Sequence, residues 1–459
     1  MEYRIEKDSM GEVKVPADAL YGASTQRAVD NFPISNLRFS RRFIWALGLQ
    51  KGSSATVAAE MGHLDPAKAE AIRTAADEVM EGRHDAQFVL DIFQTGSGTS
   101  TNTNANEVIA ARANQLLDGD EVHPNDDVNF GQSSNDAIPT AIHVAAVAAL
   151  REELLPALDK LAGSLEAKAA EFADVVKSGR THLMDATPVT LGQEFAGYAT
   201  QVRKGAQRVE KALPELEELA LGGTAVGTGL NAPDGCAAAV IALMSERSGF
   251  PYREADDHFE AQGGKDATVM ASGVLKTIAA SFFKIANDIR FLGSGPTSGI
   301  SELRLQALQP GSSIMPGKVN PVMSEMMMMV AAQVVGNDSA VTWGGANGNF
   351  ELNVMMPVIA HNLLESIELL ANAADTFAER CVDGLEANEP RARELVEKNA
   401  IVVTALNPHI GYDNGARIAK QAVASGRSVR ELVLEEGLMS EEELDEALDI
   451  KGMTEGGLR

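Results

Sequence analysis

One pattern recurs along the sequence: a loop rich in Ser, Thr, Asn and Gly leads into a long, alanine-rich apolar run. The loop HPNDDVNFGQSSND, for example, precedes AIPTAIHVAAVAALREELLPALDKLAGSLEAKAAEFA, whose apolar residues recur with helical spacing. Aromatic residues make up only 5% of the chain, and small side chains favour closely packed helices over a β-sandwich. We therefore expect a mostly α protein, a bundle of long helices with polar loops at their ends.

Local signals place several of these elements. Residues 64–82 begin with Asp-Pro and end in Gly, which predicts a helix. TGSGTSTNTNANE (Thr95 to Glu107) is too polar for a core and is expected to be a loop, and GRTHLMDATPVT (Gly179 to Thr190) is expected to be another. The run 322–335 is too apolar all round to face water. It is expected to lie inside a bundle or between subunits, which favours an oligomer.

Composition excludes several classes of protein. The formal net charge is −26 and no Lys/Arg run is present, which argues against binding nucleic acid or an anionic membrane. The two cysteines, Cys236 and Cys381, make a disulfide framework unexpected and cannot hold an iron–sulfur cluster within one chain. No apolar run reaches the ~20 residues that span a bilayer, and no secretory signal opens the chain. We expect a soluble, cytoplasmic protein.

The stretch PGSSIMPGKVNP (Pro310 to Pro321) comes directly before that apolar run. It nearly matches a phosphate-binding P-loop, but the spacing between Gly311 and Gly317 is one residue too long, and Val319 stands where a Mg-binding hydroxyl is needed. We reject the P-loop interpretation. Backbone N–H groups near Ser312 and the cation of Lys318 suit a carboxylate or an oxyanion. The alternative is an ordinary helix-capping turn.

Other polar residues are weaker candidates. Glu325 is the only charge in the apolar run, so it either sits at a solvated helix start or orients a histidine. His182 lies in a polar loop, where general acids and bases occur, although a lone histidine is more often structural. The clusters GSGTSTNTN and GQSSND can fix a small polar ligand, or they can be helix caps. HPNDD has weak spacing for a metal site and is discounted.

Taken together, these motifs resemble the fumarase/aspartase superfamily. GSSIMPGKVNP is similar to its signature GSSxMPxKxNP, and the other matching motifs follow in the expected order: SGTSTNTNANE, HPNDDVN, QSSNDAIPTA, GRTHLMDATPVTLGQE, GGTAVGTGLN and ALNPHIGYDN. The resemblance covers essentially the whole chain. It is strongest to the cluster-free, class II fumarate hydratases.

Aspartate ammonia-lyases are the nearest alternative. Where they read QSTND, DAVP and MPAKVNP, this chain has QSSND, DATP and MPGKVNP, and it has Ser97-Gly98-Thr99 in place of an AGxST-type loop. All four differences favour a fumarase. A third possibility, a structural protein that reuses the fold, is disfavoured because Ser312, Lys318, Asn320 and His182 are all present.

The resemblance implies a three-domain chain: an N-terminal lyase domain (1–132), a central helical bundle domain (133–390) and a small C-terminal helical domain (391–459). It implies a homotetramer whose core bundle comes from four subunits, with each active site shared by three of them. It implies no metal and no cofactor.

The resemblance also implies a reaction, the reversible hydration of fumarate to (S)-malate through an aci-carboxylate carbanion, and roles for residues. Ser312 corresponds to the catalytic base on a mobile loop, and His182, with a water, to the acid, oriented by Glu325. The residues that correspond to the dicarboxylate-binding set are Ser97, Gly98, Thr99, Ser133, Ser134, Asn135, Thr181, Ser313, Lys318, Val319 and Asn320. A second anion site corresponds to His123, Pro124, Asn125 and Asp126.

Overall fold

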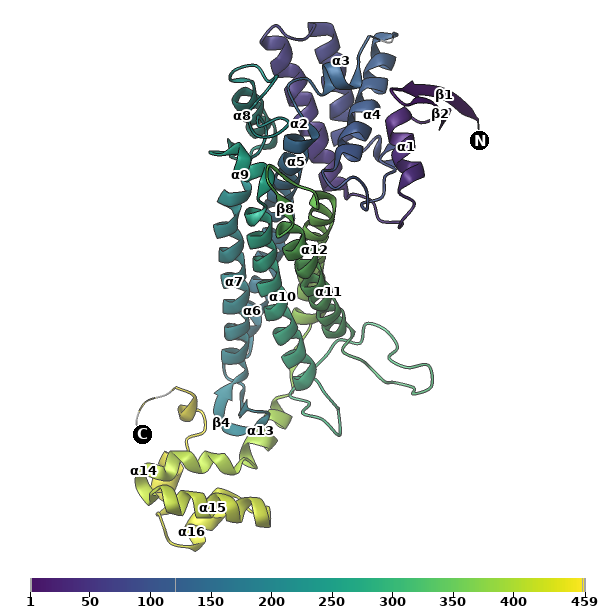
Figure 1. Cartoon of the computed structure of the whole chain (residues 1–459). Helices are drawn as coiled ribbons and strands as arrows, with labels where there is room; N and C mark the ends of the chain where they lie inside the picture. The colour runs from purple at the N-terminus through teal and green to yellow at the C-terminus, as the bar shows by residue number, and fades with distance from the viewer. Residues whose placement is uncertain (1, 120, 456, 458–459) are drawn as a thin grey trace. The chain divides into compact units, whose positions relative to one another are not determined.

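The computed structural model describes residues 2–119, 121–455 and 457. It divides into two compact units, which are treated separately below. Unit 1 comprises Met1–Pro156, Gly205–Ala279 and Val330–Asn372, and unit 2 comprises Ala157–Lys204, Ala280–Met329 and Ala373–Arg459. The divisions fall within the long helices, which are α6 (Leu155–Glu171), α7 (Leu191–Leu216), α10 (Asp266–Leu292), α11 (Val322–Gly345) and α12 (Met356–Phe377) (Figure 1).

Unit 1 is built on a group of helices around α2, which packs against α3, α5 and α8. Its helices are α1 (Ala23–Asn31), α2 (Arg41–Glu60), α3 (Pro66–Met80), α4 (Thr99–Leu117), α5 (Ser134–Ala149), α8 (Cys236–Ser248) and α9 (His258–Gly263). Short helical turns cover Asp85–Gln87, Pro124–Val128 and Leu150–Leu154. Its strands are short and paired: β1 (Tyr3–Asp8) with β2 (Gly11–Pro16), β5 (Glu218–Leu219) with β6 (Arg253–Glu254), and β8 (Gly348–Asn349) with β9 (Leu352–Asn353).

Of two elements predicted in unit 1, the structure confirms one and corrects the other. The helix expected over residues 64–82 is confirmed as α3, because Asp65 caps its N-terminus by accepting from the N–H groups of Ala67 and Lys68. The loop expected from Thr95 to Glu107 is wrong, since α4 already begins at Thr99 and buries much of this polar stretch. Burial is tolerated because distant partners accept from its amides, as Gln87 O does from Asn104 Nδ2 at 3.0 Å.

Unit 2 holds a β-hairpin and a small helical group near the C-terminus. The hairpin strands are β3 (Val176–Thr181) and β4 (Met184–Thr190), and β7 (Leu303–Arg304) pairs with β10 (Glu386–Ala387). The C-terminal helices are α13 (Glu389–Glu397), α14 (Asn407–Ile410), α15 (Tyr412–Ser425), α16 (Val429–Glu435) and α17 (Glu441–Ala447), with short turns at Ala378–Val382, Ala400–Leu406 and Gly452–Thr454. Buried side chains such as Leu406, Ile418, Val433 and Leu444 form one hydrophobic cluster among these helices.

The hairpin corrects a second expectation, because residues 179–190 were predicted to be a loop. The strands meet in a two-residue turn at His182 (φ 57°) and Leu183 (φ 61°), both in the left-handed region. Such a turn joins strands without splaying them, and it usually carries Asn-Gly. The His-Leu pair gives no such signal, so the hairpin was missed in the sequence.

Helix α10 corrects a third expectation. Among the described residues it is the one helix long and apolar enough to cross a membrane by length and composition, so the statement that no run reaches that length is wrong here. This is weak evidence for a span, since core helices of soluble proteins pass the same test. Within unit 1, Lys276 of α10 pairs with Asp338 of α11 at 2.5 Å.

The three-domain division at residues 132 and 390 stays a prediction.

Candidate active site

The predicted site residues fall into two groups, one in each unit. In unit 1 the hydroxyls predicted to bind a dicarboxylate form a chain. Thr99 Oγ1 lies 2.7 Å from Ser97 Oγ and 2.7 Å from Ser134 Oγ, so the two loops that carry these residues meet. Gly98 caps α4 with φ 71°, and an added Cβ would lie 2.9 Å from side-chain carbons of Ile138. Glycine is therefore required where these loops meet.

Helix α5 begins in this group with a capping box. The Ser133 side chain accepts from the N–H of Asn135, and the Asp136 carboxylate accepts from the N–H of Ser133 at 2.8 Å. The same carboxylate accepts from the N–H groups of Gly222 and Thr224, and Asn135 Nδ2 donates to Ala225 O at 2.8 Å. These bonds fix the GGTAVGTGLN loop beside the start of α5.

These segments line a pocket of about 380 Å³ in unit 1. Four of the predicted residues contribute to it, namely Thr99, Asn125, Ser133 and Ser134. The polar lining residues absent from the predictions are Asn102, Thr103, Asn129, Gln132, Thr224 and Asn231. No lining residue carries a charge. A cavity of hydroxyls and amides can orient a small polar ligand through several directed hydrogen bonds.

A buried cation lies behind this neutral lining. Lys51, in the middle of α2, has no exposed surface, and its Nζ donates to Asn129 Oδ1 at 2.8 Å and Gln132 Oε1 at 3.0 Å. Burial lowers the pKa of Lys51 to about 7, partly offset by the charge of Asp136. Burial likewise raises the pKa of Asp136, against the three N–H groups that donate to it. The one signal in the sequence was a lysine within the apolar stretch LGLQKGSSA.

The residues of the predicted second anion site also lie in unit 1. His123 precedes a short turn of π-helix (Pro124–Val128), and its Nδ1 accepts from the N–H groups of Asn125 and Asp126. The same Nδ1 lies 3.2 Å from Asp126 Oδ2, so a neutral Nδ1 accepts from these N–H groups and a protonated one pairs with the carboxylate. The ring of His123 is exposed to solvent.

In unit 2, the PGSSIMPGKVNP loop is closed at its base and open at its tip. Gly311 N donates to Lys318 O at 2.8 Å, and Asn320 Nδ2 donates to Gly311 O at 2.7 Å. A Cβ on Gly311 would lie 2.5 Å from Lys318 O, so this closure requires glycine. Lys318 and Val319 are exposed beyond it.

Inside this loop, backbone N–H groups surround the hydroxyl of Ser312. Its Oγ accepts from the backbone N–H groups of Ile314 at 3.2 Å and Met315 at 3.0 Å, while Ser313 is exposed. Two aligned N–H donors stabilise negative charge on the oxygen they face. The arrangement also caps a turn, so it serves the local fold at the same time.

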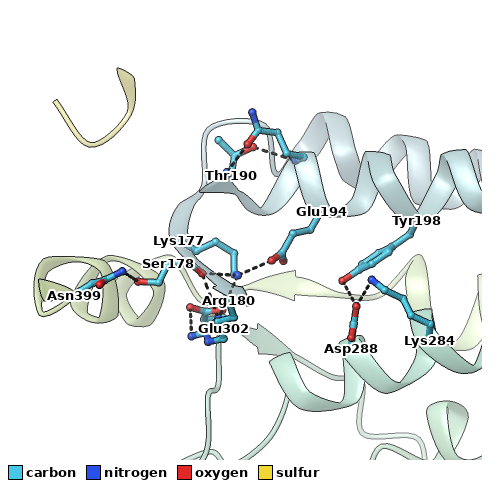
Figure 2. A network of polar contacts seen from close by, with 11 residues as sticks. Lys177, Ser178, Arg180, Thr190, Glu194, Tyr198, Lys284, Asp288, Glu302 and Asn399 are labelled. Carbon is cyan, nitrogen blue, oxygen red and sulfur yellow. Dashed lines mark hydrogen bonds and ion pairs between the residues drawn. The ribbon is translucent and has the colours of Figure 1, made fainter. Parts of the chain in front are cut away.

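The remaining unit 2 candidates are exposed in the single chain. Thr181 and His182 lie at the tip of the β3–β4 hairpin, and Glu325 lies in the first turn of α11. Among the described residues, no hydrogen bond or ion pair joins His182 to Glu325, so the orienting contact stays a prediction. Figure 2 shows the base of the hairpin, where Lys177 and Arg180 contact the buried carboxylate of Glu302. Sequence reasoning did not single out this cluster.

Comparisons with known proteins agree with this architecture. A family model described as "Lyase" matches residues 11–336, and one described as "Fumarase C C-terminus" matches residues 402–455. The class II fumarate hydratase of Mycobacterium tuberculosis (strain CDC 1551 / Oshkosh) is 56% identical, covering 98% of this chain and 96% of its own. That of Halobacterium salinarum is 54% identical, covering 100% and 98%.

A solved structure shows the same fold. The class II fumarase of Schistosoma mansoni superimposes with a TM-score of 0.96 at 38% identity, over 99% of each chain. The expected mostly α, fumarase/aspartase-like fold is thereby confirmed. The chain belongs to the family of class II fumarate hydratases.

Proposed function

We propose that this chain catalyses the reversible hydration of fumarate to (S)-malate. Family membership supports the reaction. The observation that carries the proposal is the environment of Ser312, whose Oγ receives two backbone N–H groups in a loop that also presents Lys318. A neutral, hydroxyl-rich pocket and a cation-bearing loop are the two kinds of surface that a small dicarboxylate needs.

The difficult step is the removal of a weakly acidic proton next to a carboxylate. Ser312 acts as the base, since N–H groups and the Lys318 cation stabilise its alkoxide when water is excluded. The carbanion delocalises into the neighbouring carboxylate as an aci-carboxylate, and Lys318 and Asn320 hold the added negative charge there.

Departure of hydroxide from the carbanion completes the elimination. His182, with a water, supplies the proton, and Glu325 orients its imidazole. The residues that hold the carboxylates and the hydroxyl are Ser97, Gly98, Thr99, Ser133, Ser134, Asn135, Thr181, Ser313 and Val319. His123, Pro124, Asn125 and Asp126 form a second anion site.

A complete site requires an assembly, and we propose a homotetramer in which three subunits contribute to each site. Large apolar side chains on two long helices support this. Met270 and Phe283 of α10 are 45% and 42% exposed, and Met329 and Trp343 of α11 are 67% and 70% exposed. Such surface is costly to leave in water and is typical of a helix that packs against another subunit. Burial of α11 between subunits would also account for the apolar character of the run 322–335.

An absorbance assay separates this proposal from the aspartate ammonia-lyase alternative. Fumarate formation is followed in the ultraviolet with malate or with aspartate as the only substrate. Formation from malate alone supports the proposal, and formation from aspartate alone overturns it. If neither substrate yields fumarate from a tetramer of normal stability, the chain is a structural member of the family.

A further inference from the structure

A cluster of four charges lies at the base of the hairpin that carries His182, and we call it the Glu302 cluster: Lys177, Arg180, Glu194 and Glu302. Arg180 donates two parallel hydrogen bonds to the Glu302 carboxylate, Nη1 to Oε2 at 2.8 Å and Nη2 to Oε1 at 3.0 Å. Lys177 Nζ lies 2.8 Å from Glu194 Oε1 and 3.4 Å from Glu302 Oε2. Figure 2 shows both cations directed at the Glu302 carboxylate.

The charges of the Glu302 cluster are buried, so each must lie close to a group of opposite charge. The side chains of Lys177 and Glu302 are each 1% exposed. Burial raises the pKa of Glu194 above its ordinary value, against the attraction of Lys177. Buried ion pairs gain little net stability, because desolvation offsets their attraction, but losing one partner is costly. The cluster is therefore better explained by the orientation it fixes than by the stability it adds.

The pairing of β3 with β4 is irregular beside this cluster. Lys177 and Arg180 are three residues apart and would point to opposite faces of a regular strand. The register shifts between the pairs Ser178–Pro188 and Arg180–Asp185, so that two residues of β4, Ala186 and Thr187, lie opposite the single residue Gly179 of β3. A Cβ on Gly179 would lie 2.5 Å from Thr187 O, so only glycine fits opposite this bulge. Beside it, both cations contact the same carboxylate, that of Glu302.

Glu302 is itself fixed by its backbone. Its N–H donates to Leu292 O at 2.9 Å, at the end of α10, and its C=O accepts from Asn388 N at 2.9 Å. The next residue, Leu303, pairs with Ala387 in the β7–β10 ladder. Glu302 is thus anchored to two other segments at the point where the chain leads toward the Ser312 loop.

The hairpin tip, in contrast, has little support of its own. Among the described residues, the side chains of Thr181, His182 and Leu183 make no hydrogen bond, and all three are exposed. Arg180 directly precedes Thr181. The direction in which the tip points is therefore set by the base, where Arg180 and Lys177 meet Glu302 and where Asn399 Nδ2 donates to Ala186 O at 2.8 Å.

We propose that Glu302 is a positioning residue for this reaction, acting through Arg180 to fix the direction of the Thr181–His182 tip. This inference rests on the proposed function, in which His182 supplies the proton. A tip that is misplaced by about 1 Å lowers turnover by up to a hundredfold without removing the binding groups. The bidentate geometry matters more than the charge, because only the planar guanidinium holds a carboxylate at two points.

The test is Arg180→Lys in the full-length assembly. This change keeps the positive charge but loses the fork, the two parallel hydrogen bonds from the guanidinium to the carboxylate. The matched control is Arg112→Lys, since Arg112 forms a similar fork with the buried Glu78 in unit 1, with contacts of 2.6 and 2.9 Å. For Arg180→Lys we expect kcat to fall by about tenfold or more, KM to rise by a smaller factor because Thr181 lies on the same tip, and the pH–rate profile to shift. For Arg112→Lys we expect kcat and the profile of the wild type.

Hydrogen–deuterium exchange provides a readout that needs no activity. Arg180→Lys is expected to increase exchange in residues 176–190, and Arg112→Lys is not. An Arg180→Lys enzyme with wild-type kcat and pH profile but faster exchange would show that the cluster is only structural and would overturn the inference. A wild-type protein that does not hydrate fumarate would instead refute the proposed function, while the exchange comparison still tests whether Arg180 fixes the hairpin.

If Arg180→Lys does not assemble, the double variant Arg180→Gln/Glu302→Gln takes its place. It removes one charge of each sign and leaves Lys177 paired with Glu194. We expect the same loss of kcat with a smaller rise in KM, and wild-type kcat in an assembled double variant overturns the inference.

Discussion

Lys51 has no exposed surface, and its Nζ donates a 2.8 Å hydrogen bond to Oδ1 of Asn129, a residue that lines the neutral pocket of unit 1. The pocket thus has a cation behind it although no lining residue is charged. Asn129 Oδ1 also accepts from Asn102 Nδ2, and Gln132 Oε1 from Gln50 Nε2. Each oxygen keeps a donor if the lysine is removed, so the lysine can be tested by substitution.

The first prediction concerns Lys51→Met and the pH dependence of stability. The folded pKa of Lys51, about 7, lies below its ordinary value of 10.5 because burial disfavours the cation. Between these values the unfolded chain binds more protons, so this group makes the wild type more stable as pH rises from about 7 to 10.5. Lys51→Met should remove that rise and be the more stable protein at pH 7. Thermal unfolding at several pH values measures both, and an unchanged pH slope would contradict the prediction.

The second prediction concerns the closure of the PGSSIMPGKVNP loop, which carries Ser312. Gly311→Ala places a Cβ 2.5 Å from Lys318 O and 2.9 Å from Lys318 C, both backbone atoms that cannot rotate away. The base of the loop must open, so we expect lower kcat, while the melting temperature stays close to that of the wild type because the loop is mostly exposed. Gly163→Ala, in α6 with nothing within 4 Å of the added Cβ, is the control and should retain kcat. Equal kcat in both variants would show that the closure is unimportant.

The sequence predicts elements best where local chemistry decides them. The start of α3 follows from Asp65 and Pro66, which cap and open the helix. The start of α4 could not be predicted, because buried amide nitrogens there donate to partners outside the helix, as Asn102 Nδ2 does to Asn129 Oδ1. Polarity alone made that segment look like a loop.

The candidate site shows the same limit. Motif resemblance identified Ser312, Lys318 and His182, but neither motif nor spacing pointed to Lys51 or Glu302. Both are single charged residues in otherwise unremarkable stretches, and their importance depends on which side chains face them in the fold. The bulge of β4 opposite Gly179 and the turn at His182 with positive φ likewise leave no standard sequence signal.

The third prediction is that Lys318 contributes to the binding of a dicarboxylate and that another exposed lysine does not. Lys318 lies at the closed base of the loop with its side chain exposed, and we propose that it binds a substrate carboxylate. Lys318→Met should weaken binding of a dicarboxylate inhibitor by roughly tenfold to a hundredfold, the effect of one charge-assisted hydrogen bond. Lys420→Met, an exposed lysine on α15, should bind as the wild type does. Calorimetric titration measures both affinities, and full affinity in Lys318→Met would refute the cation-site proposal.

The fourth prediction separates the proposed base from its neighbour. Ser312→Ala removes the oxygen that receives two N–H groups, and kcat should fall by about a hundredfold or more, as for loss of a proton-transfer group. Ser313→Ala, which removes only a proposed substrate contact, should raise KM more than it lowers kcat. Size-exclusion chromatography should show the same assembly for both. Near-normal turnover in Ser312→Ala would remove Ser312 as the base.

The last prediction concerns Glu325, which is exposed in the first turn of α11 and has no ion-pair partner among the described residues of its own chain. A carboxylate in that position gains from the helix dipole alone, so its stability contribution is small. If it orients His182 in the assembled enzyme, Glu325→Gln keeps the shape but loses the charge that favours the imidazolium. The acidic limb of the pH–rate profile should then shift or flatten, while the melting temperature changes little. Asp413→Asn, at an exposed acid in the first turn of α15, is the control. Identical profiles for Glu325→Gln and the wild type would show that Glu325 does not act on His182.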